Sequence, residues 1–467
     1  MNRAWWWPAS GVLAVGLALV GASAVPAQQP AASAVTDDDR ARVTVVCPTV
    51  VGTNEPTAVA AGSPAGEVAT AQLSSPERPA VGGSSFTLDE SAGEPVVVTA
   101  PRLDAFSATT RTAAAAGSDR GLSMMSCGRP SAAQWFAGVL SSGTATADLV
   151  LLNADAQDAA VDLTLYGAEG RLTAPGSRGI IVPARSRRVV PLGPLFTNAQ
   201  PVSVRVSTSA GRVVAAVRQR MLNGGSPAGS DWLPPTTEPA RAVVVPGLPA
   251  GKGSRDLVVV NPGDRTASVA LQVLGADGPT AVPGFETIDL PPGTSRVVPL
   301  GSALAEAPVG LQLTSEQKVT AAVVGTNGAG AAAIDISTQV ATVALDGPGV
   351  LALSPGAKLA PVLHLANGSA EPVRARVVVQ AARPALATQP LLDTWVSVPG
   401  GADVTVELPR AAESLVGVQP ETTGAIHASV AVRSDLDGVT GVASLAVLPG
   451  AAAATLPPIR QDVRVGW

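Results

Sequence analysis

The chain contains two histidines, His364 and His427, and they are the first place to look for acid–base chemistry. A general base needs an acid or a nucleophile within hydrogen-bond reach. His364 lies in an expected strand and His427 near another, and neither belongs to a motif that supplies such a partner. No G-x-S-x-G elbow occurs, and no S-x-x-K motif stands with its companion motifs. We therefore predict two ordinary strand residues, no catalytic residue and no enzymatic activity.

The two cysteines, Cys47 and Cys127, are the next reactive pair. In an exported chain, two cysteines most simply form one disulfide, and two buried free thiols are the alternative. Closing a loop of about 80 residues stabilises a fold by roughly 4–5 kcal/mol in the chain-entropy model. The spacing of the cysteines and histidines does not match a zinc site. We predict the disulfide, with no metal and no cofactor.

Carboxylates are too numerous for counting alone to exclude the pair that a glycosidase needs. They fall mainly in expected turns, where aspartate serves the backbone. Three tryptophans are candidates for contact with a sugar: Trp135, Trp232 and Trp395. Trp135 precedes a strand directly, which favours the core. Trp232 lies in the Pro-rich junction GSDWLPP, where it either sets an angle between domains or meets a ligand.

A local basic cluster is formed by Arg185, Arg187 and Arg188, and Arg296 matches Arg188 in a second copy of the segment. Anionic wall polymers or lipid headgroups are one set of partners for it. A solvated strand edge that discourages edge pairing is the interpretation we favour. The net charge of −5 and the lack of a basic domain argue against nucleic acid as a partner.

The elements that would position these residues are indicated by an internal repeat. Residues 148–193 recur at 256–301 with a constant offset of 108, and 20 of the 46 positions are identical. Val161, Leu163 and Leu165 alternate with polar residues, which predicts a strand with one buried face. Gly-Ala-acid-Gly turns follow at matched places, and a last strand pair is expected to complete each copy, at 202–208 with 212–218 and at 309–314 with 318–324.

A third, degenerate copy places residues 364–367 (HLAN) where the first copy has 150–153 (VLLN). The composition agrees with β structure, since 48 glycines and 41 prolines suit short strands and frequent turns. We predict an all-β fold of tandem immunoglobulin-like β-sandwich repeats, packed end to end. Residues 329–336 and 411–416 are expected to form single helical turns.

The predicted boundaries follow from these patterns. Residues 42–129 form a Cys-bridged β unit that is either separate or part of the next domain. Within it, strands are expected at 42–47, 68–73, 85–88, 96–100 and 122–127, and a loosely ordered insertion over 48–127 is the alternative. The full division is 1–27 signal peptide or transmembrane anchor, 28–41 linker, 42–129 Cys-bridged unit, 130–238, 239–346 and 347–459 repeats one to three, and 460–467 tail.

The N-terminal segment predicts export. Arg3 precedes a stretch that carries no charge until Asp37, and Ala22-Ser23-Ala24 fits a signal-peptide cleavage pattern. The stretch is also long enough to span a bilayer if it is retained, with the tryptophans of residues 5–7 at the interface. Cleaved signal and retained anchor both stay open. In either case the chain after Asp37 is expected outside the cytoplasm.

The repeat resembles an uncharacterised actinobacterial family of exported or singly membrane-anchored β-repeat proteins, a domain of unknown function. The resemblance is carried by the turn after Asn153 or Asn261, the G-A-[DE]-G turn and the R-V-V-P-L-G strand, with Cys47-Pro48 and the CGRP at 127–130. It implies an extracytoplasmic location and β structure. It supplies no catalytic residue to transfer, because a likeness of fold does not carry an activity.

Function is expected to be structural or binding. We predict a non-enzymatic scaffold or binding ectodomain of the cell envelope, with Trp232, Trp135 and Arg188 as ligand-contact candidates. Its partner would be an envelope protein or a cell-wall glycan, and it would touch the membrane through an uncleaved N-terminal segment. One alternative is a carbohydrate-active enzyme or its glycan-binding accessory. Another is a regulatory partner of a membrane protein in envelope biosynthesis.

Overall fold

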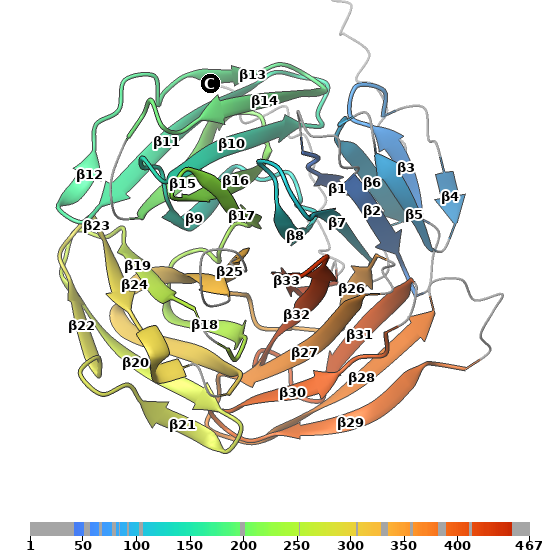
Figure 1. Cartoon of the computed structure of the whole chain (residues 1–467), viewed down its shortest axis with the longest axis vertical. Helices are drawn as coiled ribbons and strands as arrows, with labels where there is room; N and C mark the ends of the chain where they lie inside the picture. The colour runs from blue at the N-terminus through green and yellow to red at the C-terminus, as the bar shows by residue number, and fades with distance from the viewer. Residues whose placement is uncertain are drawn as a thin grey trace, which may run out of the picture. The chain divides into compact units, whose positions relative to one another are not determined.

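One strand plan, repeated in four copies, makes up the described part of the chain (Figure 1). We name them copy I (β1–β8), copy II (β9–β17), copy III (β18–β25) and copy IV (β26–β34). All lie within one unit, Val43–Trp467, apart from Arg42, which begins β1. The computed structural model describes residues 42–50, 57–64, 68–76, 81–83, 85–90, 93–101, 106–196, 201–251, 253–304, 307–327, 335–354, 358–381, 389–410 and 413–450.

The strands have the following bounds. Copy I contains β1 (Arg42–Cys47), β2 (Thr57–Gly62), β3 (Val68–Gln72), β4 (Val81–Gly83), β5 (Ser85–Glu90), β6 (Val96–Pro101), β7 (Ser107–Ala114) and β8 (Gly121–Ser126). Copy II contains β9 (Ala133–Val139), β10 (Ala145–Asn153), β11 (Ala159–Gly167), β12 (Gly170–Leu172), β13 (Ile180–Val182), β14 (Ser186–Pro191), β15 (Val202–Ala210), β16 (Val214–Asn223) and β17 (Ser226–Leu233). Copy III contains β18 (Ala240–Leu248), β19 (Arg255–Asn261), β20 (Ala267–Gly275), β21 (Gly278–Ala281), β22 (Thr287–Leu290), β23 (Thr294–Pro299), β24 (Val309–Asn327) and β25 (Asp335–Val340). Copy IV contains β26 (Gly349–Leu353), β27 (Leu359–Asn367), β28 (Val373–Ala381), β29 (Leu392–Val398), β30 (Asp403–Glu407), β31 (Ser414–Pro420), β32 (Ile426–Leu436), β33 (Val439–Ala446) and β34 (Leu448–Pro449).

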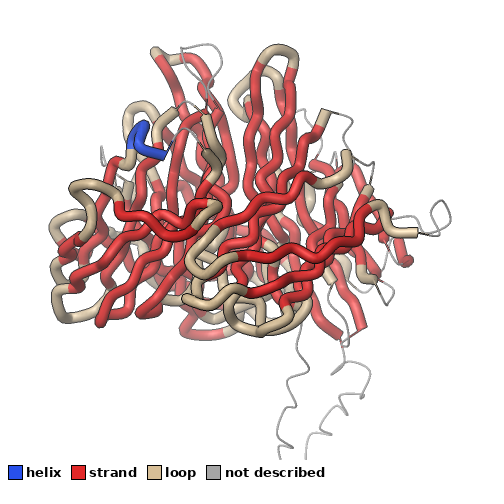
Figure 2. The backbone as a smooth tube through the Cα atoms, turned by 90° about the horizontal axis from the view of Figure 1, so that it is seen from below, coloured by secondary structure: helices blue, strands red, loops and turns tan. Residues whose placement is uncertain are grey.

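Each copy is an antiparallel sandwich of two sheets, and the all-β prediction is confirmed. The leading sheet contains the first strand of a copy, as in β26-β31-β28-β29 of copy IV. The closing sheet contains the last long strand, as in β33-β32-β27-β30. Alternation explains the layers, because successive residues of β20 are buried and exposed in turn from Ala267 to Val273. Figure 2 shows how completely strands account for the described backbone.

A buried asparagine ends the second strand of copies II, III and IV in the same way. The side-chain amide nitrogen of Asn153 lies 2.8 Å from the carbonyl oxygen of Gln157 and 3.0 Å from that of Val182. Its Oδ1 accepts the backbone N–H of Asp155. Asn261 and Asn367 make the corresponding bonds, which explains why this residue is shared among the three copies.

The copies contact one another in a closed cycle, in which the leading sheet of one packs on the closing sheet of the next. Apolar contacts join copy I to II, II to III and III to IV. The expectation of end-to-end packing is wrong, because copy IV also returns to copy I. Val350 and Leu415 of its leading sheet pack on Ala60 of β2, and the Thr109 hydroxyl of β7 donates to the Ala352 carbonyl at 2.8 Å.

Copy I follows the same plan as the other three, although its sequence does not align with them. The strands predicted at 42–47, 68–73, 85–88, 96–100 and 122–127 are present within a residue or two. The prediction missed β2, which carries a run of small residues, TAVAAG, and β7, SATTRTAA. Their small side chains give little apolar alternation to read, although both strands are largely buried.

Two expected helical turns are wrong in the part that the structure describes. Residues 335–336 and 414–416, the ends of the turns expected at 329–336 and 411–416, belong to strands β25 and β31. Residues 328–334 and 411–412 lie outside the described residues. Two strands were expected between Val309 and Val324, but β24 runs unbroken and pairs in both sheets. Copy II turns at Gly211, whose φ is +70°, whereas copy III has no glycine at that place.

The predicted signal or anchor (1–27) and linker (28–41) lie outside the described residues, and so does the predicted tail (460–467). Among the residues that the structure does describe, no helix has the length and apolar character needed to cross a membrane.

Candidate functional site

The predicted disulfide between Cys47 and Cys127 is confirmed, with a Cα–Cα distance of 4.5 Å. Cys47 ends β1 and Cys127 follows β8, so the bond joins the first and last strands of copy I. Both sulfurs lie in the core of the copy beside Val59 and Val98. The bond therefore links the two ends of the copy I sandwich through its apolar core.

His364 has an acidic partner that the sequence did not reveal. Its Nδ1 lies 3.3 Å from Oδ1 of Asp403, and both residues are buried. Ser429 is the cross-strand neighbour of His364, so a serine, a histidine and an aspartate come together. The Ser429 hydroxyl donates to the Pro246 carbonyl of copy III, and Oδ2 of Asp403 accepts the N–H of Gly247. The group therefore joins copies III and IV, and its serine proton is already held by a backbone oxygen.

His427 lies at the same junction. Its Nδ1–H donates to the Thr342 carbonyl at 2.9 Å. Burial lowers the pKa of His427 to about 4, although the bond to Thr342 opposes the change. The ring is therefore neutral at pH 7. The two histidines thus lie in or beside strands, as expected, and both serve the contact between copies.

The tryptophans proposed as ligand contacts are buried. Trp135 packs on Tyr166 of its own copy and on Val260 of copy III, and its Nε1–H donates to Glu238 at 3.1 Å. Trp232 is 1% exposed and lies where copy I meets copy II, with the Arg218 guanidinium 5.3 Å from its ring centroid. A ligand could stack on either ring only after these contacts open. Trp232 therefore lies at a junction between copies, as one of the two sequence interpretations expected. The junction is the one between copies I and II.

The arginines of the predicted basic cluster make hydrogen bonds within the protein. Arg188 of β14 donates to the Ile181 carbonyl at 3.0 Å, and Arg296 donates to the Asp289 carbonyl in the matching place. Arg187 bonds to the Gly93 carbonyl and to the Thr49 hydroxyl of copy I. These bonds favour a structural role for Arg187 and a strand-edge role for Arg188.

A buried charged cluster occupies the place where the four copies meet. The last long strands β8, β17, β25 and β33 contact one another in a cycle, and Figure 1 shows them facing one another. They place Ser123, Ser230, Ser337 and Ser444, spaced by 107 residues, at equivalent buried positions. The ionisable members of the cluster come from copies I, II and III, and only Arg220 among them is partly exposed: Asp119, Arg218, Arg220, Asp231 and Asp335.

Asp119 is the ion-pair partner in this cluster. Arg218 lies 3.0 Å and Arg220 lies 2.9 Å from its Oδ1. Burial opposes ionisation of Asp119, yet the two guanidinium groups outweigh it and lower its pKa. Burial lowers the pKa of Arg218, and the charge of Asp119 counteracts this. The three groups join copies I and II by paired, desolvated charges.

Asp335 and Asp231 behave in the opposite way. Burial raises the pKa of Asp335 to about 7, against backbone hydrogen bonds from Leu122, Val442 and Ile336. Burial and the charge of Asp335 raise the pKa of Asp231 well above its usual value. These carboxyls accept N–H groups from other copies, so they are buried structural acceptors whose ionisation is coupled to the contact between copies.

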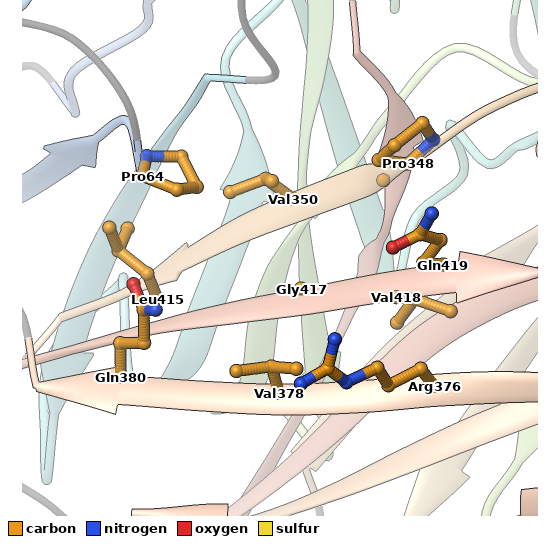
Figure 3. A pocket seen from close by; sticks show the side chains of 11 residues that line it. Pro64, Pro348, Val350, Arg376, Val378, Gln380, Leu415, Gly417, Val418 and Gln419 are labelled. Carbon is orange, nitrogen blue, oxygen red and sulfur yellow. The ribbon is translucent and has the colours of Figure 1, made fainter. Parts of the chain in front are cut away.

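A groove of about 300 Å³ lies on the outer face of the leading sheet of copy IV, where copy I approaches it. Figure 3 shows Val350, Val378 and Leu415 forming its apolar floor. Pro64 of copy I and Pro348 stand at its rim. The side chains that add hydrogen-bonding groups are Arg376, Gln380 and Gln419.

Trp395 extends this face onto the neighbouring strand. It is the cross-strand partner of Arg376, so both side chains lie on the same side of the sheet. Its side chain is 52% exposed, and the Arg374 guanidinium lies 5.1 Å from its ring centroid. Arg374 and Arg376 form two-bond ion pairs with Glu421 and Asp393. These pairs lower the pKa of both carboxyls.

Trp395 was one of three tryptophan candidates in the sequence, but it was not among the predicted ligand contacts. The available signal was its place in β29, LDTWVSV, where Leu392, Thr394 and Val396 form the inward set. Asp393 and Trp395 therefore point outward. We call the groove and Trp395, with its two flanking ion pairs, the copy IV face. Within the described ranges, no three His, Cys, Asp or Glu residues are grouped closely enough to hold a metal ion.

Comparison with known proteins gives a family and little more. No curated protein matches the chain. A crystal structure titled "Crystal Structure of Thermotoga maritima 1070" is 20% identical over 23% of this chain and 96% of that one, with a TM-score of 0.20. Residues 86–382 match a family described only as one of unknown function. The match runs from β5 of copy I to just after β28 of copy IV. The chain belongs to this family, DUF5719.

Proposed function

We propose that this protein is a non-enzymatic binding protein of the cell envelope that works outside the cytoplasm. The observation that carries the proposal is the groove of the copy IV face. Its lining combines apolar floor residues with guanidinium and amide groups that can orient a ligand. Among the residues that line it there is no carboxylate, histidine or hydroxyl to perform acid–base or nucleophilic chemistry.

The location is proposed from two features. A disulfide persists mainly in oxidising compartments, and Cys47–Cys127 is buried inside a copy. The uncharged segment before Asp37 is the export signal or the membrane anchor. The source is proposed to be an actinobacterium, on the resemblance and on a basic complement of arginine with three lysines, as a GC-rich genome favours.

The scaffold role is proposed from the closed cycle of copies. Each copy is held by two neighbours and by the buried cluster at the centre, so the copy IV face rests on a support with many shared contacts. Ligand contacts on such a support stay preorganised, which reduces the entropy cost of binding.

Crosslinking in the native envelope tests this function. A photo-reactive amino acid replaces Gln380 in the groove, and a control chain carries it at Ser209, an exposed residue of copy II. We expect an adduct at Gln380 and none at Ser209, with the protein accessible to protease added to cells whose outer layers have been removed. A protein found in the cytoplasm with reduced cysteines, or equal adducts at both positions, would contradict the proposal.

A further inference from the structure

We propose that the copy IV face binds a neutral glycan, with Trp395 as the stacking platform and the groove as the adjoining subsite. The inference rests on the proposed function and names its ligand class. Three observations carry it: a repeat position that is buried between copies elsewhere but exposed in copy IV, an exposed aromatic ring, and a set of polar groups whose charges balance.

One repeat position is buried in copies II and III but exposed in copy IV. Tyr166 and Leu274 lie 13 residues after Asn153 and Asn261, and both are buried against the next copy. The corresponding residue of copy IV, 13 residues after Asn367, is Gln380. Gln380 is exposed and lines the groove. An apolar residue that would extend the contact with copy I is thus replaced by an amide, and part of the sheet face is left open.

The open face offers what a sugar ring needs. The C–H face of a pyranose packs on an aromatic ring, and Trp395 presents half of its surface to solvent. The hydroxyls of a sugar both donate and accept, so planar groups of both kinds beside the ring suit them. Arg374 with Glu421 and Arg376 with Asp393 provide donors and acceptors, held in place by bonds of 2.7–2.9 Å.

The charge balance selects a neutral ligand. Each arginine of the face has its own carboxylate, and the groove adds two glutamine amides, so the named groups carry no net charge. A polyanion would find two compensated cations, and a basic peptide would find two compensated carboxylates. A groove of about 300 Å³ is at the lower end of ligand sites and accommodates roughly one or two sugar rings.

The test is calorimetric titration of the full chain with neutral tetrasaccharides of glucose, N-acetylglucosamine, galactose and arabinose. Polyphosphate and a proline-rich peptide serve as competing ligand classes. We expect binding of at least one neutral tetrasaccharide, with an affinity that changes less than about twofold between low and high salt, because no net charge is neutralised.

Matched variants assign the binding to the face. Trp395→Ala should weaken binding at least about tenfold, as expected for an aromatic anchor, and Trp395→Phe should restore part of it. Ile181→Ala, at an exposed apolar residue of copy II, should leave the affinity unchanged. Arg374→Ala should weaken binding, whereas Arg212→Ala should not, although Arg212 makes a comparable exposed ion pair with Asp155.

Three results would overturn the inference: no neutral glycan binds, Trp395→Ala binds as the unaltered protein does, or only polyphosphate or the peptide binds at this face. The variants change exposed side chains, so an unchanged thermal midpoint shows that folding is intact. Failure here leaves the envelope location untouched, because protease accessibility tests the location separately, and the Gln380 crosslink detects a groove partner of any class.

Discussion

Oδ2 of Asp335 accepts a hydrogen bond of 3.0 Å from the backbone N–H of Leu122, which lies 213 residues earlier in the chain. The same oxygen accepts the N–H of Val442 at 3.0 Å. One carboxyl of copy III thereby holds the edges of β8 in copy I and β33 in copy IV. A buried titratable group at the centre therefore takes part in holding the closed cycle of copies together.

The Asp335 carboxyl packs against Gly121, where no side chain would fit. Gly121 has a φ of +126°, and a Cβ there would lie within van der Waals overlap of Oδ1 of Asp335, at 2.3 Å. We expect Gly121→Ala to lower the free energy of unfolding by at least about 2 kcal/mol, through backbone strain and displacement of the carboxyl. Gly143→Ala meets no atom within 4 Å and should stay within about 0.5 kcal/mol. Denaturant midpoints that match for the two variants would contradict the arrangement.

Asp335 should make stability depend on pH in a definite direction. The pKa of Asp335 in the folded protein, about 7, lies above the ordinary aspartate value of 3.8, so between these pH values the folded state holds a proton that the unfolded state has lost. This contribution is complete below pH 4 and is lost as pH rises to 7. As pH rises over that range, the free energy of unfolding of Asp335→Asn should increase relative to that of the unaltered protein by on the order of 4 kcal/mol. The difference in denaturation free energy, measured from pH 4 to 8, checks this, and a pH-independent difference would exclude it.

His427 should act in the opposite direction. Its pKa is lowered to about 4, so below pH 6.5 the unfolded state takes up a proton that the folded state refuses. The contribution of the neutral ring is present above pH 6.5 and is lost as pH falls to 4. The stability of His427→Gln relative to the unaltered protein should therefore increase as pH falls. Thermal midpoints at pH 7 and pH 4.5 measure this, and Asp335→Asn provides the comparison with the reverse slope.

The repeated asparagine turn should contribute equally in three copies. Asn153→Ala, Asn261→Ala and Asn367→Ala each leave buried carbonyls and one N–H without a partner, and should cost about 2–3 kcal/mol of unfolding free energy. Asn223→Ala, at the exposed end of β16, is the matched control and should change little. Equal stability of all four variants in denaturant would show that the turn hydrogen bonds contribute nothing.

Loss of the disulfide should destabilise copy I. Cys47→Ser with Cys127→Ser frees a loop of 80 residues, for which the chain-entropy model predicts a loss of about 4–5 kcal/mol. Limited proteolysis should then cut first within residues 42–127. Adding a reductant should lower the thermal midpoint of the unaltered protein and leave the double variant unchanged. A midpoint of the unaltered protein that ignores the reductant would contradict this expectation.

Sequence patterns were sufficient where structure is local and repeated. The buried–exposed alternation of β11 and β20 and the matched asparagine turns predict strands and sandwiches without further information. The disulfide followed from there being one possible pair. Copy I escaped detection as a fourth copy because β2 and β7 are built from small residues, so the plan is kept while the pattern is lost.

The contacts between copies were decided by the tertiary structure, because they join residues that no local pattern relates. Asp335 of copy III meets Leu122 of copy I, and Asp403 of copy IV meets Gly247 of copy III, only once the copies have packed on one another. Trp232 and Trp395 are equally apolar in the sequence, yet one is sealed between copies and the other is exposed. Whether a strand face is covered depends on the neighbouring sheet, and that is why the candidate site appears in the assembled fold and not in the repeat.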